Sequence, residues 1–145
     1  MGAPDDSVLE QEKPLMANQD IKLTASMNGT NKIDITGSGG RTLGKGSGAH
    51  IFRFELDDRT THNVKFASLT AADDCSTCPP DTSKPNTQID KVRIDNSSSP
   101  RTARFRDKND NKPAMDVSYE WHFTCDDPNI TVSSFDPIIS NGGRV

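Results

Sequence analysis

The sequence lacks the long apolar runs that membrane-spanning helices require. No stretch approaches the roughly 18 consecutive apolar residues of such a helix, and hydrophobic residues make up only 31% of the 145 residues. The N-terminal stretch, Met1 to Asp20, also has neither the basic segment nor the apolar segment of a secretory signal. We therefore expect no membrane span and no signal peptide in this chain; a mature protein whose signal had been removed would look the same.

Cysteine is also scarce. The three cysteines are an odd number, whereas a disulfide framework normally has an even number at regular spacings. This count favours a reducing compartment, so we expect a cytoplasmic protein. Two interpretations of the pair Cys75 and Cys78 remain open, a local disulfide and two loop thiols.

Neither sign of charge dominates the sequence. There are 21 acidic and 17 basic residues, which gives a net charge of -4 and no general attraction to nucleic acid. The positions predicted to face outward carry basic side chains without the aromatic neighbours that nucleic-acid surfaces use. We expect a solvated sheet face and no nucleic-acid partner. The basic residues concerned are Arg53, Lys65, Lys91, Arg93, Arg101, Arg104 and Arg106.

Helical periodicity is nearly absent, and short runs of alternating apolar and polar residues take its place. The strongest run covers residues 116–125, where every second residue from Val117 to Cys125 is apolar. Such runs between turn signals predict an all-β fold, an antiparallel β-sandwich of about 7–8 strands, with an immunoglobulin-like arrangement as one option. We expect this single domain over residues 19–145, after a disordered tail, 1–18, that shows no periodicity.

The same alternation predicts a hairpin and a core. Residues 21–25 and 32–36 alternate on either side of Asn28-Gly29, a pair that favours a two-residue hairpin turn. The inward positions of the other runs form the predicted core. These are Phe52, Phe54, Val64, Phe66, Val92, Ile94, Phe105, Tyr119, Trp121 and Phe123.

A glycine-rich stretch, 37–48, resembles a phosphate-binding loop without completing it. Residues 39–46 match GxxxxGK, but Gly46 stands where a Ser or Thr would hold magnesium. The motif also needs a following helix whose N-terminus faces the phosphate, and residues 50–56 alternate like a strand. We therefore interpret the stretch as a flexible hairpin loop.

The sequence offers no catalytic residues by motif. It contains no GxSxG elbow and no recognisable catalytic cysteine, so we expect a protein that is not an enzyme. A zinc site is the one alternative that would make the protein an enzyme or a zinc-stabilised domain. Two pairs, Cys75 with Cys78 and His122 with Cys125, could supply four ligands, although residues three apart on a strand face opposite sides.

The segment from Asp107 to Pro113, DKNDNKP, carries the sharpest local signal. It resembles the DxNDNxP linker motif of cadherins, and this resemblance implies a calcium site formed by Asp107, Asn109, Asp110 and Asn111. The pattern departs from the family because too few residues follow Pro113 to form a second repeat. An Asn- and Asp-rich hairpin turn explains the same composition.

The C-terminal Asp-Pro pairs suggest a second resemblance. Asp127-Pro128 and the stretch 135–141, FDPIISN, are similar to the end of a small bacterial all-β family named DP-EP after such motifs. The Glu-Pro half of that pattern is missing here. The resemblance implies a bacterial protein with a β-sandwich and no assigned activity.

Three functional hypotheses follow from the sequence. The first is a non-enzymatic interaction or structural module that binds a protein partner or itself, through loops 37–48 and 71–86 or an edge strand. The second is a calcium-dependent binding or adhesion domain. The third is a zinc-dependent enzyme or a zinc-stabilised domain.

Overall fold

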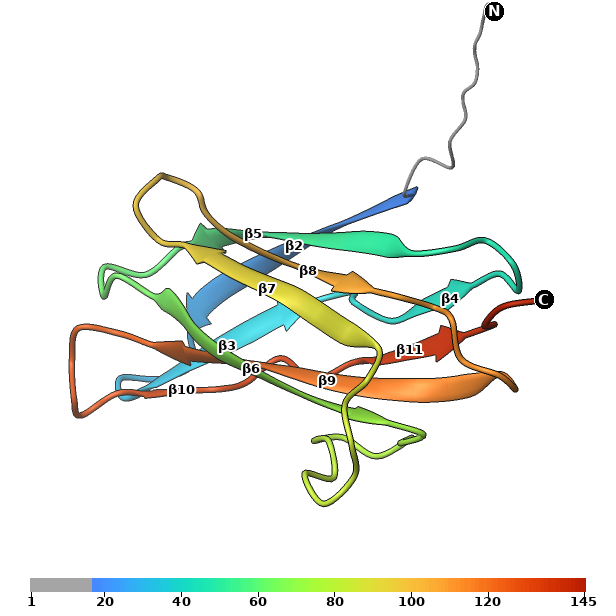
Figure 1. Cartoon of the computed structure of the whole chain (residues 1–145). Coiled ribbons are helices and arrows are strands. Elements are labelled where there is room, and N and C mark those ends of the chain that lie inside the picture. The colour runs from blue at the N-terminus through green and yellow to red at the C-terminus, as the bar shows by residue number, and fades with distance from the viewer. Residues whose placement is uncertain (1–16) are drawn as a thin grey trace, which may run out of the picture.

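The computed structural model describes residues 17–145 as a β-sandwich, which confirms the predicted fold class (Figure 1). Within these residues there is no helix, and hence none that could cross a bilayer. The predicted disorder of residues 1–16 lies outside the described residues, while Ala17 and Asn18, predicted to belong to the tail, begin the first of the described strands. The strands are β2 (Ala17–Met27), β3 (Lys32–Gly37), β4 (Arg41–Leu43), β5 (His50–Asp58), β6 (Lys65–Asp73), β7 (Ile89–Asp95), β8 (Arg101–Asp107), β9 (Met115–Thr124), β10 (Thr131–Val132) and β11 (Ile138–Asn141).

Two sheets form the layers of the sandwich (Figure 1). The larger has six strands in the order β10-β3-β2-β5-β8-β7, and the smaller has four in the order β4-β11-β9-β6. The expectation of a purely antiparallel fold is wrong for three pairs, because β2 with β5, β3 with β10 and β4 with β11 are parallel. A parallel pair needs a crossover. For β2 and β5 that crossover runs through β3 and then β4, which belongs to the other sheet.

Aromatic rings fill the space between the sheets. Phe52 and Phe54 of β5, Phe105 of β8, and Tyr119 and Trp121 of β9 are at most 1% exposed. Their rings meet at centroid distances such as 5.0 Å between Phe52 and Phe105 and 5.5 Å between Phe54 and Trp121. The alternating pattern correctly predicted these five residues as core.

The prediction that Val92 lies in the core is wrong, because a β-bulge changes the phase of β7. The pairing with β8 shifts between Asp90 and Arg93, and Lys91 has φ 52°. Ile89 is buried and Ile94 is partly buried, although residues five apart on a regular strand face opposite sides. The bulge lets both isoleucines point inward. Val92 lies within the bulge and is 47% exposed.

The first hairpin and the glycine-rich stretch also differ in detail from the expectations. β2 and β3 pair as predicted, but Met27 pairs with Ile33, so the connection is longer than two residues. Gly29 takes φ 79° within it, a conformation that glycine adopts without strain. In the glycine-rich stretch, Arg41–Leu43 form β4 and pair with β11.

Candidate functional site

The segment predicted to bind calcium begins at the last residue of β8. Asp107 follows the inward position of Phe105 by two residues and is therefore also inward, with no exposed surface. Its Oδ1 accepts hydrogen bonds from the Asn109 amide at 3.0 Å and from Asn141 Nδ2 at 2.7 Å. Burial raises the pKa of Asp107 to about 6, because the ionised form is poorly solvated there.

Asn109 connects three segments that lie far apart in the sequence. Its side-chain Nδ2 donates to the Gly44 carbonyl at 3.2 Å and the Gly48 carbonyl at 3.1 Å, and its Oδ1 accepts from the Gly143 amide at 2.8 Å. The residue is 1% exposed and has φ 50°. Asn109 therefore joins the glycine-rich loop and the C-terminal segment to the end of β8.

The structure brings the four predicted calcium residues into one loop, where the Oδ1 atom of each accepts a hydrogen bond from the protein and Asp107 Oδ2 is buried without a partner. Asp110 Oδ1 accepts from Gln88 Nε2 at 2.9 Å, and Asn111 Oδ1 accepts from Asn141 Nδ2 at 3.1 Å. Calcium takes six to eight oxygen ligands, and most of these oxygens would have to exchange a protein donor for the ion. The calcium site stays a prediction.

The four predicted zinc ligands do not come together. Cys75 follows the end of β6, and Cys125 follows the end of β9, its antiparallel partner, so the two lie at opposite ends of the ladder. These ends are roughly 25 Å apart at about 3.3 Å per residue. All three cysteines are free. Residues 17–145 contain no group of three His, Cys, Asp or Glu side chains placed to hold a metal ion.

A serine–histidine contact lies beside the glycine-rich loop, and the sequence did not reveal it. Ser47 Oγ and His50 Nε2 are 2.9 Å apart, within reach for a nucleophile and its base. The other ring nitrogen of His50 meets the Gln19 side-chain amide, where a catalytic triad has a carboxylate. The Ser47 hydroxyl also lies 2.7 Å from the Gly44 carbonyl, to which it donates. The contact fixes the loop and supplies no activated nucleophile.

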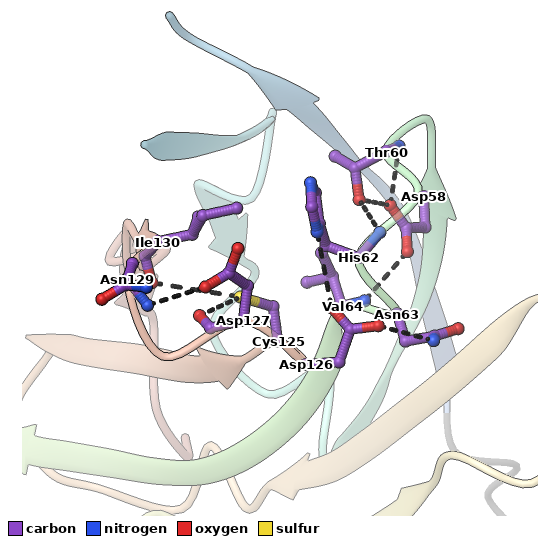
Figure 2. Close-up of polar contacts among 10 residues, drawn as sticks. All are labelled: Asp58, Thr60, His62, Asn63, Val64, Cys125, Asp126, Asp127, Asn129 and Ile130. Atoms are coloured by element: carbon purple, nitrogen blue, oxygen red, sulfur yellow. Dashed lines mark hydrogen bonds and ion pairs between the residues drawn. The ribbon is translucent and has the colours of Figure 1, made fainter. Parts of the chain in front are cut away.

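A second polar cluster lies at the other end of the sandwich, where the β5–β6 loop meets the loop after β9 (Figure 2). Asp58 Oδ1 accepts from the Thr60 amide at 2.9 Å, and its Oδ2 accepts from the Val64 amide at 2.9 Å. Because Val64 itself is fully buried, these bonds hold both ends of the β5–β6 loop against the core.

Asp126 links the two loops shown in Figure 2. Its Oδ1 lies 3.4 Å from His62 Nδ1, its Oδ2 accepts from Asn63 Nδ2 at 3.0 Å, and its amide donates to the His62 carbonyl. Cys125 directly precedes Asp126 in the chain, but its Sγ donates to the Asp127 carbonyl at 3.4 Å. The arrangement orients a histidine without a nucleophile beside it and is best explained as a loop clamp.

The outer face of the six-stranded sheet carries a different feature, a row of arginines. In the strand register Arg53 of β5 pairs with Arg104 of β8, and Arg104 pairs with Arg93 of β7. We call these three residues the arginine row. All three side chains are exposed, and Asp20 of β2 stands next to Arg53 at one end.

The guanidinium groups of the arginine row are not paired with carboxylates. Within residues 17–145, no carboxylate lies within 4.0 Å of any of them. They line a hollow of about 630 Å³ on the outer face, together with residues of the neighbouring strands such as Thr102 and Asp95. Like charges directly opposite one another destabilise a sheet, so the row has no stabilising role in the fold by itself.

The sequence pattern identified these basic residues but not their grouping. Alternation placed Arg53 and Arg104 outward, yet the position of Arg93 beside Arg104 depends on the bulge, which shifts the register by one residue. The prediction of a solvated face followed from the lack of aromatic side chains among these basic residues, and it stays a prediction.

Comparison with models of known protein families gives no match, and comparison with curated protein sequences gives none either. The resemblances to the DP-EP family and to the cadherin motif therefore stay predictions. The function must be argued from the residues themselves.

Proposed function

We propose that the domain is a non-enzymatic binding module that recognises an anionic group on the outer face of its six-stranded sheet. The observation that carries this proposal is the arginine row, three guanidinium groups that have no carboxylate partner within residues 17–145 and line a hollow of about 630 Å³. Hollows of roughly 300 to 1,000 Å³ are the usual size of ligand sites.

The charges around the arginine row support an anion rather than a neutral ligand. Two neighbouring cations of the same sheet are already paired, since Arg106 meets Asp90 at 2.6 Å and Lys22 meets Glu55 at 3.6 Å. A guanidinium group binds a carboxylate or phosphate through two parallel hydrogen bonds. An incoming anion would therefore supply the carboxylate or phosphate partner that these three guanidinium groups do not have within residues 17–145.

An NMR titration with citrate, a small tricarboxylate, tests this function. We expect saturable shifts that are largest for the arginine row and Asp20, and roughly tenfold weaker binding by Arg104→Gln, because a charge-assisted hydrogen bond contributes about 1.5 to 3 kcal/mol. The matched control is Arg144→Gln, which removes the same charge from the exposed C-terminal segment. Shifts spread evenly over the surface, or equal affinities for the two variants, would contradict the proposal.

A further inference from the structure

Resting on the proposed function, we propose that the occupant of the arginine row is an extended acidic segment of a partner protein that carries carboxylates on alternate residues.

The arginine row is one residue wide along the strands, because the residues on both sides of it form ion pairs. On one side of it, Arg106 of β8 forms a two-point contact with Asp90 of β7, at 2.8 and 2.6 Å. On the other side, Lys22 and Glu55 form an ion pair. The uncompensated charge therefore runs across the strands as a line, and a ligand must present its own charges in a line to match it.

The length of this line fits a short extended peptide. Neighbouring strands lie about 4.8 Å apart, so the arginine row spans about 10 Å from Arg53 to Arg93. In an extended chain, alternate side chains project from one face about 6.8 Å apart. Two carboxylates in a Glu-x-Glu segment thus fall within the reach of three guanidinium groups, each of which can bind a carboxylate at two points.

A nucleic acid fits the same face poorly. Every Phe, Tyr and Trp of residues 17–145 is buried, so the outer face has no aromatic platform on which bases could stack. Three carboxylates, those of Asp20, Glu55 and Asp95, also line the hollow. They would repel a continuous polyanion, whereas a peptide places charges only at chosen positions and offers backbone N–H groups to such carboxylates.

Protection of a sheet edge does not explain the arginine row. Charged side chains on edge strands discourage unwanted strand pairing, and this accounts for Arg93 on the edge strand β7. Arg53 and Arg104 lie on the interior strands β5 and β8. Like charges opposite one another oppose sheet stability, so ligand binding is the role that fits all three arginines.

Fluorescence anisotropy with four labelled probes tests the identity of the occupant. The probes are the peptide Glu-Ser-Glu-Ser-Glu, its counterpart with Gln in place of Glu, its counterpart with phosphoserine in place of Glu, and an oligothymidylate. The proteins are the full chain, its Arg104→Gln and Arg144→Gln variants, and a Glu10→Gln/Glu12→Gln variant, because residues 10–12 are themselves Glu-Gln-Glu.

We expect the glutamate peptide to bind the full chain and the Arg144→Gln and Glu10→Gln/Glu12→Gln variants alike, with at least a tenfold loss for Arg104→Gln and no binding of the glutamine peptide. Tighter binding of the phosphopeptide or the oligothymidylate would overturn the acidic-segment proposal and leave the anion-binding function standing. Tighter binding by the Glu10→Gln/Glu12→Gln variant would make the chain's own segment the occupant and overturn a separate partner. Failure of every probe, together with failure of citrate, would remove the function itself.

Discussion

At the scale of single residues, buried Asp and Asn side chains at the ends of β8 and β11 and in the loop after β8 connect separate segments of the fold. Asp107, Asn109 and Asn141 are all at most 1% exposed and are hydrogen-bonded to one another or to nearby backbone. Buried amides and carboxylates destabilise a fold unless their hydrogen bonds are satisfied. Their bonds join the end of β8 to the glycine-rich loop and the C-terminal segment, while Asp107 Oδ2 and Asn141 Oδ1 are buried without a hydrogen-bond partner.

The pKa of Asp107 makes the stability of the fold depend on pH. Because this pKa is about 6 in the folded protein and 3.8 in its ordinary state, the unfolded chain loses the proton first, and stability falls as the pH rises from about 4 to about 6. We expect Asp107→Asn, which stays neutral, to gain up to roughly 3 kcal/mol relative to the wild type between pH 4 and pH 7. Urea unfolding at both pH values measures this difference.

The control for this experiment is Asp110→Asn, an exposed carboxylate in the same loop. A relative gain of equal size for Asp110→Asn would show that burial at Asp107 is not the cause. The same samples test the calcium prediction. If calcium raises the unfolding midpoint of the wild type but not of Asp107→Asn, the ion binds at Asp107; an unchanged midpoint of the wild type would contradict the calcium prediction.

At the scale of the element, strand β7 determines whether the binding face exists. Its bulge places Arg93 opposite Arg104 and leaves Val92 exposed. The bulge depends on Lys91, which has φ 52°. Residues with a side chain are strained in this region, and β-branched residues most of all.

We expect substitutions at Lys91 to follow this backbone conformation. Lys91→Gly should stabilise the protein by up to about 1 kcal/mol, because glycine adopts positive φ freely, and Lys91→Val should destabilise it by a similar amount or more. Urea unfolding of the two variants measures both effects, and each removes the same charge, so they control for each other. A more stable Lys91→Val would mean that β7 is regular in solution and that Arg93 does not join the arginine row.

At the scale of the whole molecule, the proposed binding face opposes the stability of the sandwich that carries it. We expect Arg104→Gln, the variant that loses binding, to be more stable than the wild type by about 0.2 to 1 kcal/mol, because it relieves the repulsion from two opposite arginines while keeping most of the side-chain stem. The gain should shrink at high salt, which screens exposed charges. Thermal unfolding at two salt concentrations, with Arg144→Gln as the reference, measures it.

A destabilised Arg104→Gln would contradict this expectation and would also weaken the binding experiments, since loss of affinity could then follow from loss of structure. A stabilised variant with lost affinity separates the two roles of the residue. Such exchange of stability for function is common at binding sites.

The sequence by itself determined the class of fold and most of the aromatic part of its core. Alternation with a period of two identified the inward residues of β5, β8 and β9, such as Phe52, Phe105 and Trp121, because burial of one sheet face is recorded locally in the chain. It also identified the arginines as outward. Where a bulge changed the phase, as at Val92, the same local argument gave the wrong side.

Only the tertiary structure decided which outward and loop residues are neighbours. The parallel pairing of β2 with β5, the contacts of Asn109 with Gly44 and Gly143, and the grouping of the arginine row join segments that no local pattern relates. Strand order and register depend on how whole elements pack, and a shift of one residue exchanges every neighbour across a sheet. The arginines were visible in the sequence, and their arrangement as a single row came from the register of three strands.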